Sequence, residues 1–199
     1  MLLQAMADLE WAVGSWDVLL LQEVAMPNNC AWLEDAARLG IGEHTLLKNT
    51  VTAHDTAIVV HKRHKDKIKK VLCDSEHMWL LLSDGSWQAW FASAHLPDSW
   101  KGLEAFEQSA TLLHQALRQR ACESNIVLVG LDANARINGD WLEPELCGPK
   151  TEGAALSDKK TIERCEVWSS LCPESRVRIS NSFGYPGCDG STWTFESHK

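Results

Sequence analysis

"WDVLLLQEV", residues 16–24, places two polar residues directly after a continuous apolar run. Its four central residues, 18–21, are all apolar, and a short apolar run bounded by polar residues predicts a buried strand. Gln22 and Glu23 follow this run directly. Because a carboxylate beside a core strand costs free energy unless something pairs with it, Glu23 either has a partner or is a solvated residue at the end of the strand.

The composition is that of an ordinary globular domain with a net negative charge. The chain has 199 residues, of which 45% are apolar and 23% are charged, and this length suits one domain. The net charge of −8 argues against a protein that holds nucleic acid by bulk electrostatic attraction, since such binding relies on Lys and Arg. An enzyme whose positive charge comes from a bound metal ion stays compatible with this charge.

Cysteine usage and hydropathy predict an intracellular protein, in the nucleus or cytoplasm, and not a secreted one. The seven Cys are an odd number, none forms a CxxC pair, and no secretory signal opens the chain, so reduced thiols are expected. No apolar run approaches the roughly 18 to 20 residues of a membrane span, so no membrane partner is expected. No pattern in the sequence predicts an oligomeric state.

The periodicity of apolar residues predicts a mixture of helices, strands and hairpins. Amphipathic spacing predicts helices at residues 2–13, 31–39, 104–122 and 161–171, the last ended by Pro173. Apolar runs predict strands at residues 17–22, 56–62 and 125–134, a hairpin over residues 78–96, and late strands at 177–180 and 191–195. Asp84-Gly85 within the hairpin suits a type I′ turn. This order predicts an α+β fold or a layered sandwich, and not a purely parallel sheet.

Residues 63–70, RHKDKIKK, form a run that consists mostly of Lys and Arg. The ordinary interpretation is a solvated strand end followed by a turn. The alternative is a contact with the phosphate backbone of a nucleic acid.

Three apolar segments share one feature, which is a polar residue at or just after the C-terminal end. The first ends in Glu23, the hairpin ends in His95, and the third ends in Asp132 and Asn134. If these ends meet at one rim of packed sheets, two carboxylates, an imidazole and a carboxamide face one cleft. Such a set suits hydrolysis of a phosphate ester with a hard divalent ion. Taken singly, each residue also has a structural explanation, as a solvated strand end, a structural histidine or a turn former.

The same segments resemble successive motifs of one known family. DVLLLQEV, SAHLP, LVGLDAN and STWTF are similar, in order and spacing, to motifs of the endonuclease/exonuclease/phosphatase superfamily, the DNase I-like proteins. The resemblance extends over nearly the whole chain, which is interpreted as one partial domain, residues 1–199. The segment SNSFGYPGCDGSTWTF, residues 180–195, most resembles endonuclease domains of non-LTR retrotransposons and their reverse-transcriptase polyproteins.

The resemblance implies a fold, a cofactor and residue roles. The family fold is a four-layered α/β sandwich, incomplete here, and the family activity is cleavage of phosphate esters with a divalent ion, here Mg²⁺ or Mn²⁺. By motif, Glu23 would be the metal ligand, and His95 would contact the scissile phosphate or help the leaving group. Asp132 would orient the nucleophile, and Asn134 would bind phosphate.

Other parts of the family pattern bear on substrate and activity. Trp193 and Thr194 would lie near the substrate, which is expected to be nucleic acid, with DNA favoured by the C-terminal resemblance. The family's Asn-bearing first strand and its final Asp and SDH motifs have no counterpart in these 199 residues, and His198 lacks an acidic residue just before it. The chain as given is therefore expected to have little or no catalytic activity. The alternatives are an inactive remnant that serves as a binding module and a phosphatase acting on a small phosphate ester.

Overall fold

The computed structural model describes residues 17–23, 44–49, 56–74, 76–124, 126–135, 142 and 159–177 of the chain. The chain divides into two compact units. The first unit comprises Met1–Leu96 and Gln119–Ala133, and the second comprises Pro97–Arg118 and Asn134–Lys199.

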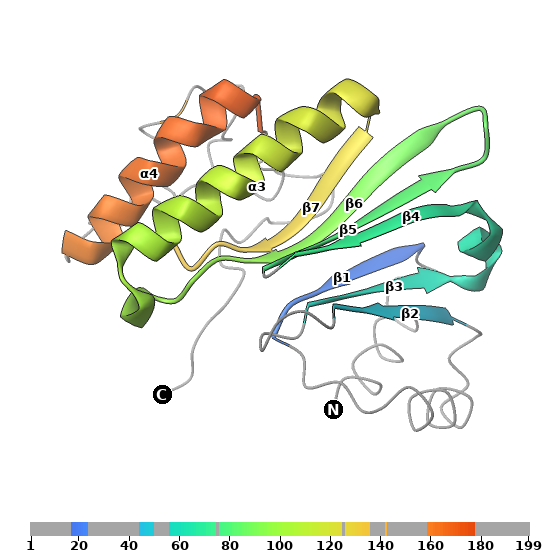
Figure 1. Ribbon diagram of the computed structural model, residues 1–199, viewed down its shortest axis with the longest axis horizontal. Coiled ribbons are helices and arrows are strands. Elements are labelled where there is room, and N and C mark those ends of the chain that lie inside the picture. The colour runs from blue at the N-terminus through green and yellow to red at the C-terminus, as the bar shows by residue number, and fades with distance from the viewer. Residues whose placement is uncertain are drawn as a thin grey trace, which may run out of the picture. The chain divides into compact units, whose positions relative to one another are not determined.

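The first unit contains two β-sheets (Figure 1). A three-stranded antiparallel sheet has the order β1-β3-β2, formed by Val18–Leu21, Ala57–His61 and His44–Lys48. A four-stranded sheet has the order β4-β5-β6-β7, formed by Ile68–Cys73, His77–Ser83, Gln88–His95 and Ile126–Asp132. Strands β4, β5 and β6 pair antiparallel, whereas β6 and β7 run parallel. The 3₁₀-helix η1, Lys62–Lys67, connects β3 of the first sheet to β4 of the second.

The two sheets pack face to face through alternate side chains of their strands. Ile58 and Val60 of β3 are buried in one cluster with Met78, Leu80 and Leu82 of β5. Within each strand these residues are two apart, so they share one face of the pleated backbone. Partly buried side chains from both sheets complete this core, namely Val18, Leu20, Leu47, Ile68 and Phe91. Removal of this apolar surface from water is the main force that holds the sheets together.

The opposite face of the four-stranded sheet is built around two tryptophans. Trp79 of β5 and Trp90 of β6 are buried and meet edge to face, with 6.5 Å between their ring centroids. The guanidinium of Arg120, in the last turn of helix α3 (Leu103–Glu123), lies 4.6 Å from the Trp90 ring centroid and 5.7 Å from that of Trp79. A cation near an aromatic face is stabilised by the ring quadrupole, which offsets part of the cost of burying Arg120.

Strand β1 passes unusually close to β7. A Cβ atom at Gly130 would lie only 2.6 Å from the Cβ of Leu20 and 3.1 Å from Nε2 of Gln22. Carbon atoms in contact normally keep about 3.5–4.0 Å between them. Glycine at position 130 is therefore what allows the two sheets to approach each other at this end.

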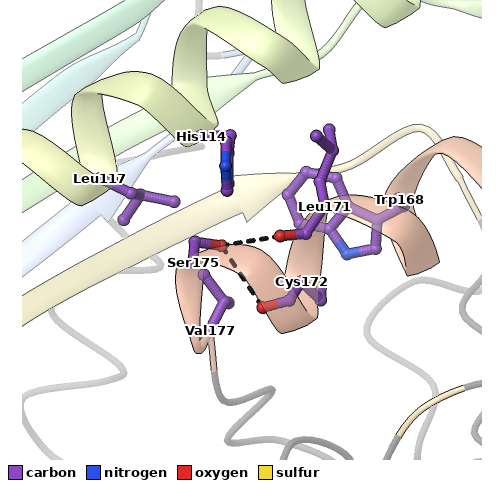
Figure 2. A pocket seen from close by; sticks show the side chains of 7 residues that line it. All are labelled: His114, Leu117, Trp168, Leu171, Cys172, Ser175 and Val177. Atoms are coloured by element: carbon purple, nitrogen blue, oxygen red, sulfur yellow. Dashed lines mark hydrogen bonds between the residues drawn. The ribbon is translucent and has the colours of Figure 1, made fainter.

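The second unit contains the larger part of α3 and helix α4, Lys159–Ser175. Phe106, Ala110 and Leu113 of α3 are fully buried, as the apolar spacing of this helix predicts. A cavity of about 10 Å³ lies between the two helices, and Figure 2 shows its lining: His114, Leu117, Trp168, Leu171, Cys172, Ser175 and Val177. This volume holds about one water molecule, so the cavity is too small for a substrate.

Helix α4 extends beyond its predicted end. The prediction stopped it before Pro173, but the helix continues to Ser175 with Pro173 inside it. Pro173 has no N–H group to donate, so the last turn of the helix lacks one hydrogen bond. The end is closed by two backbone bonds, from Arg176 N to the Pro173 oxygen (3.2 Å) and from Val177 N to the Cys172 oxygen (3.1 Å). Arg176 has a φ of 53°, the left-handed conformation that such a cap requires.

The turn between β5 and β6 also differs from its prediction. A type I′ turn requires positive φ at both central residues, yet only Gly85 has it, at 93°, and Asp84 does not. Ser83 pairs with Gln88, so the loop has four residues, 84–87. The longer loop lets the Asp84 carboxylate accept hydrogen bonds from Ser86 and Trp87. Hydrogen bonds from the Ser86 side chain and from the backbone lower the pKa of Asp84 to about 2.

The α+β class is confirmed, and several local predictions lie outside the described residues. Strands β2 and β4 had no prediction of their own, whereas β1, β3, β5, β6, β7 and α3 lie where they were expected. The predicted helices 2–13 and 31–39 and the late strands, except for Val177, lie outside the part of the chain that the structure describes. Neither α3 nor α4 combines the length and apolar character that a membrane crossing requires.

We expect the Gly130→Ala variant to lose about 1–3 kcal/mol of unfolding free energy, the usual cost of overpacking. The added methyl group would meet the Cβ of Leu20, which is fixed to the backbone, so that β1 must move. Chemical denaturation followed by tryptophan fluorescence measures the loss. Leu128→Ala on the same strand is the control, because Leu128 is 50% exposed and its truncation should cost less than about 0.5 kcal/mol. A Gly130→Ala variant as stable as the wild-type protein would contradict the close approach.

Candidate active site

Gln22 and Ser93 hold the end of β1 against β6 and β7. Gln22 donates from Nε2 to the Gly130 carbonyl oxygen at 2.9 Å and to Ser93 Oγ at 3.1 Å. Ser93 Oγ in turn donates to the Leu21 carbonyl oxygen at 2.6 Å. Ser93 is fully buried, and buried polar groups are costly unless each finds a partner. We call this network the β1 clasp; its members are Leu21, Gln22, Ser93 and Gly130. It fixes the end of β1 and therefore the position of the next residue, Glu23.

Glu23 follows the β1 clasp in a strained backbone conformation. Its φ is 52°, in the left-handed region that costs a residue with a Cβ about 1–2 kcal/mol. In this conformation Glu23 Oε1 lies 3.1 Å from Nε2 of His95 on β6. Strain of this kind persists only where the surrounding structure holds the residue in place, as the β1 clasp does here.

His95 and Asp132 occupy paired positions at the ends of two parallel strands. The register of β6 and β7 places His95 opposite Asp132. Leu96 N donates to the Asp132 carbonyl oxygen at 2.9 Å, which holds the two strand ends together. The distance between Asp132 Oδ2 and His95 Nε2 is 3.9 Å. One ring nitrogen of His95 therefore lies close to the carboxylates of both Glu23 and Asp132.

Glu23, His95 and Asp132 together form a cluster that we call the rim site. One ligand atom from each residue lies within 4.8 Å of the other two. The His95 side chain is 2% exposed, whereas those of Glu23 and Asp132 are 56% and 40% exposed. The imidazole thus lies on the buried side of the cluster, and an ion or a substrate can reach both carboxylates from solvent.

The donor set of the rim site fits a hard divalent cation. Mg²⁺ and Mn²⁺ prefer oxygen ligands, often one or two carboxylates with the remaining positions filled by water or substrate phosphate. Two carboxylates at this separation also repel each other unless a positive charge lies beside them. A divalent cation held between them would supply that charge.

The turn between β4 and β5 supports the strand end that carries His95. The Glu76 carbonyl oxygen accepts a hydrogen bond from His95 N at 3.3 Å. Within the turn, the Asp74 carboxylate accepts from the backbone N–H groups of Glu76 and His77, at 3.0 and 2.7 Å. Burial alone would raise the pKa of Asp74, but hydrogen bonds from the His77 ring and from these backbone groups lower it below its ordinary value. Asn49, next to β2, donates to the Asp74 carbonyl oxygen at 3.0 Å and ties the turn to the other sheet.

Comparison with known proteins adds a structural relative. No protein-family model matches the sequence, and no curated protein matches it. Among solved structures, the human Nocturnin catalytic domain with a bound sulfate anion matches with a TM-score of 0.51 and 17% identity, over 87% of this chain and 62% of that chain. The chain has the DNase I-like fold.

Further solved structures align with this DNase I-like chain less well. TDP2 from Caenorhabditis elegans matches with a TM-score of 0.46 and 20% identity, over 66% of this chain and 41% of that chain. TDP2 from D. rerio, complexed with a single strand DNA product, matches with a TM-score of 0.44 and 15% identity, over 66% of this chain and 53% of that chain. The chain spans only about 41% to 62% of the length of these solved chains.

Arg164 of α4 is a structural anchor in the second unit that sequence reasoning missed. It is 3% exposed and donates to three backbone carbonyl oxygens, those of Pro97 at 2.7 Å, Asp98 at 2.6 Å and Asn134 at 2.9 Å. Its guanidinium also lies 4.5 Å from the ring centroid of Phe106. Burial lowers the pKa of Arg164, and the nearby charge of Asp98 opposes this change.

The segments that Arg164 holds follow the two rim-site strands in the chain. Pro97 comes two residues after His95, and Asn134 comes two residues after Asp132. The sequence signal for Arg164 is its helical spacing from Cys165, Trp168 and Cys172, which the structure shows to be buried together with it. A charged residue at such a position indicates a partner, although it does not say which.

Of the residues predicted for the site, the structure brings together Glu23, His95 and Asp132. Asn134 belongs to the second unit, where its backbone has a φ of 43° and its carbonyl oxygen is bound by Arg164. The predicted contact of the Asn134 side chain with phosphate stays a prediction. Trp193 and Thr194 lie outside the described residues.

We expect Arg164→Met to destabilise the protein by on the order of 3 kcal/mol, since three buried carbonyl groups lose a charged donor. Arg164→Lys should recover only part of this loss, because an ammonium group lacks the planar fork of donors. Thermal unfolding measures both changes. Arg118→Met is the control, since Arg118 is exposed on α3 and its loss should change stability by less than about 0.5 kcal/mol. If the Arg164→Met variant unfolded at the same temperature as the wild-type protein, the three hydrogen bonds would make no contribution to the stability of the fold.

Proposed function

We propose that the rim site binds Mg²⁺ or Mn²⁺ and serves the hydrolysis of phosphodiester bonds in nucleic acid. One observation carries this proposal: three strands far apart in the sequence bring ligand atoms of Glu23, His95 and Asp132 within 4.8 Å of one another. Single polar residues at strand ends are common. The meeting of two exposed carboxylates with a buried imidazole requires the register of three strands, and it matches the geometry that this chemistry needs. The motif resemblance supports the same reaction.

Glu23 and Asp132 are the residues that would hold the ion. Both carboxylates are open to solvent, and their oxygens are the ligands that these ions prefer. When bound, such an ion offsets the negative charge that develops on the phosphate oxygens during hydrolysis. In this proposal Glu23 serves as a metal ligand. Asp132 has a second role, because its carboxylate also accepts a hydrogen bond from the attacking water and orients it.

His95 provides a proton at the buried side of the rim site. Its Nε2 lies 3.1 Å from Glu23 and 3.9 Å from Asp132, so it can hold a proton between the carboxylates and donate it toward a phosphate oxygen. Backbone hydrogen bonds at His95 N and Leu96 N keep this part of the chain in place while the substrate binds. The carboxamide of Asn134 is proposed to donate a second hydrogen bond to phosphate.

Nucleic acid is the proposed substrate, with DNA favoured over RNA. The support for this substrate is the motif at residues 180–195, which also makes an endonuclease of the non-LTR retrotransposon type the finer proposal, with Trp193 and Thr194 near the substrate. Such an enzyme would act in the nucleus or the cytoplasm. The net charge of −8 favours a second candidate, a phosphatase that acts on a small phosphate ester.

Mn²⁺ should bind the chain weakly, and Glu23→Gln should abolish this binding because the substitution removes a charged ligand. Asp132→Asn should weaken the binding for the same reason. Electron paramagnetic resonance of free Mn²⁺ measures both effects without any need for turnover. Asp66→Asn is the control, since Asp66 is an exposed carboxylate on η1 outside the rim site, and its loss should leave binding unchanged. Equal Mn²⁺ affinity in Glu23→Gln and wild type would remove Glu23 from the site.

A phosphodiester should bind beside the metal ion, which ³¹P NMR can detect. The dinucleotide thymidylyl-thymidine should show a phosphorus line broadened by the Mn²⁺-loaded protein, because paramagnetic broadening requires a phosphorus atom close to the ion. The Glu23→Gln variant should show only the broadening caused by free Mn²⁺. Stronger broadening with thymidine monophosphate than with the dinucleotide would favour the phosphatase. Equal broadening with wild type and Glu23→Gln, for either ligand, would contradict a phosphate site here.

A further inference from the structure

The Lys-rich run has a distinct place in the first unit. In residues 62–70 six side chains are Lys or Arg and one is Asp, a formal charge of +5 within a chain of net charge −8. These residues form η1 and the first part of β4. The exposed cations among them, which we call the basic turn, are Lys62, Arg63, Lys65, Lys69 and Lys70.

The basic turn lies at the end of the strands opposite to the rim site. Strands β1 and β3 are antiparallel, with Val18 opposite Val60, so η1 begins near the start of β1 and Glu23 follows its end. On the other sheet, Lys67 of η1 lies 3.6 Å from Asp84 in the β5–β6 turn. Strand β6 runs from this turn to His95 over eight residues, a length of roughly 23 Å at 3.3 Å per residue.

Asp17 and Asp84 are described acidic residues that pair with cationic side chains of η1. Asp17 accepts hydrogen bonds from Arg63 at 2.7 Å and pairs with His64 at 2.5 Å. Asp84 pairs with Lys67, whose ammonium also lies 5.3 Å from the Trp87 ring centroid. In the part of the chain that the structure describes, Lys65, Lys69 and Lys70 form no ion pair.

Protection of a sheet edge explains some of these lysines. Strand β4 is the outer strand of its sheet among the described strands, and Lys on an edge strand discourages pairing with another chain. This explanation covers Lys69 and Lys70, which lie on β4. It does not cover Lys62, Arg63 and Lys65, which lie on η1 and extend the same positive surface.

We propose that the basic turn binds the phosphate backbone of the nucleic acid whose phosphodiester the rim site receives. The inference rests on the proposed function and adds a second contact about 23 Å away. Each strand of B-form DNA carries one phosphate per 3.4 Å of helix axis, so a span of about 23 Å along the axis covers about seven nucleotides. Trp87, which is 36% exposed beside Lys67, adds an aromatic surface to the same end of the sheet. A chain that is acidic overall thereby gains a local surface that attracts a polyanion.

The test measures binding of a fluorescein-labelled 30-base-pair DNA by fluorescence anisotropy in the absence of divalent ions. The variant is Lys65→Gln/Lys69→Gln/Lys70→Gln, and the control is Arg118→Gln/Lys159→Gln/Lys160→Gln, which removes the same charge from exposed positions of α3 and α4. The variant should lose roughly tenfold or more in affinity at about 0.1 M salt, and the salt dependence of log K should become shallower by about 2–3. The control should change affinity by less than about twofold. The Lys65→Arg/Lys69→Arg/Lys70→Arg protein should bind like the wild type, because the contact requires charge alone.

Three outcomes would overturn the proposal. Equal losses in the variant and the control would show an effect of net charge only. Unchanged DNA binding together with self-association in sedimentation velocity would assign the lysines to edge protection. Unchanged DNA binding together with lost binding to phosphatidylserine vesicles would assign the surface to a membrane. Because no divalent ion is present, this result is independent of Mn²⁺ binding at the rim site, and the variant should still give the ³¹P broadening with thymidylyl-thymidine.

Discussion

The carboxamide of Gln22 is the contact on which the functional end of the first unit depends. It joins β1 of one sheet to Ser93 and Gly130 of the other. Hydrophobic packing between the sheets is non-directional and would tolerate small displacements of β1, whereas hydrogen bonds have a defined geometry. A displacement by one residue would turn Glu23 away from His95. Gly130 is part of the same constraint, because any side chain there would separate β1 from β7.

The strands of the first unit separate charge along their length. At one end, the rim site gathers two carboxylates around a buried imidazole. At the other end, Arg63, His64 and Lys67 of η1 pair with Asp17 and Asp84. The two proposals give each end a ligand of opposite sign, a divalent cation at the rim site and a polyanion at the basic turn. A nucleic acid with its metal ion carries both.

The sequence predicts the strand ends well because their signal is local. An apolar run followed by Glu23, His95 or Asp132 needs no knowledge of the rest of the chain, and these three side chains meet in the structure. Strand β4 was not predicted because its sequence shows no regular alternation of apolar and polar residues. Its lysines, which suit an exposed edge strand, were interpreted as part of a turn. The role of Arg164 was not predicted because its partners are backbone carbonyl groups 30 to 67 positions away along the chain. The pattern of side chains in a sequence carries no information about such contacts. The type I′ turn was wrong because Asp84 stabilises a longer loop.

The parallel pairing of β6 with β7 also has a consequence for biosynthesis. Glu23 and His95 are 72 residues apart, and Gln22 and Gly130 are 108 apart, whereas the β5–β6 hairpin closes over a four-residue loop. Local contacts form quickly and distant ones slowly, so the hairpin that carries His95 can fold before β7 has been synthesised. Until β7 docks, β6 presents an open hydrogen-bonding edge that can recruit other nascent chains. The step that brings Asp132 beside His95 is therefore also the step that covers the open edge of β6.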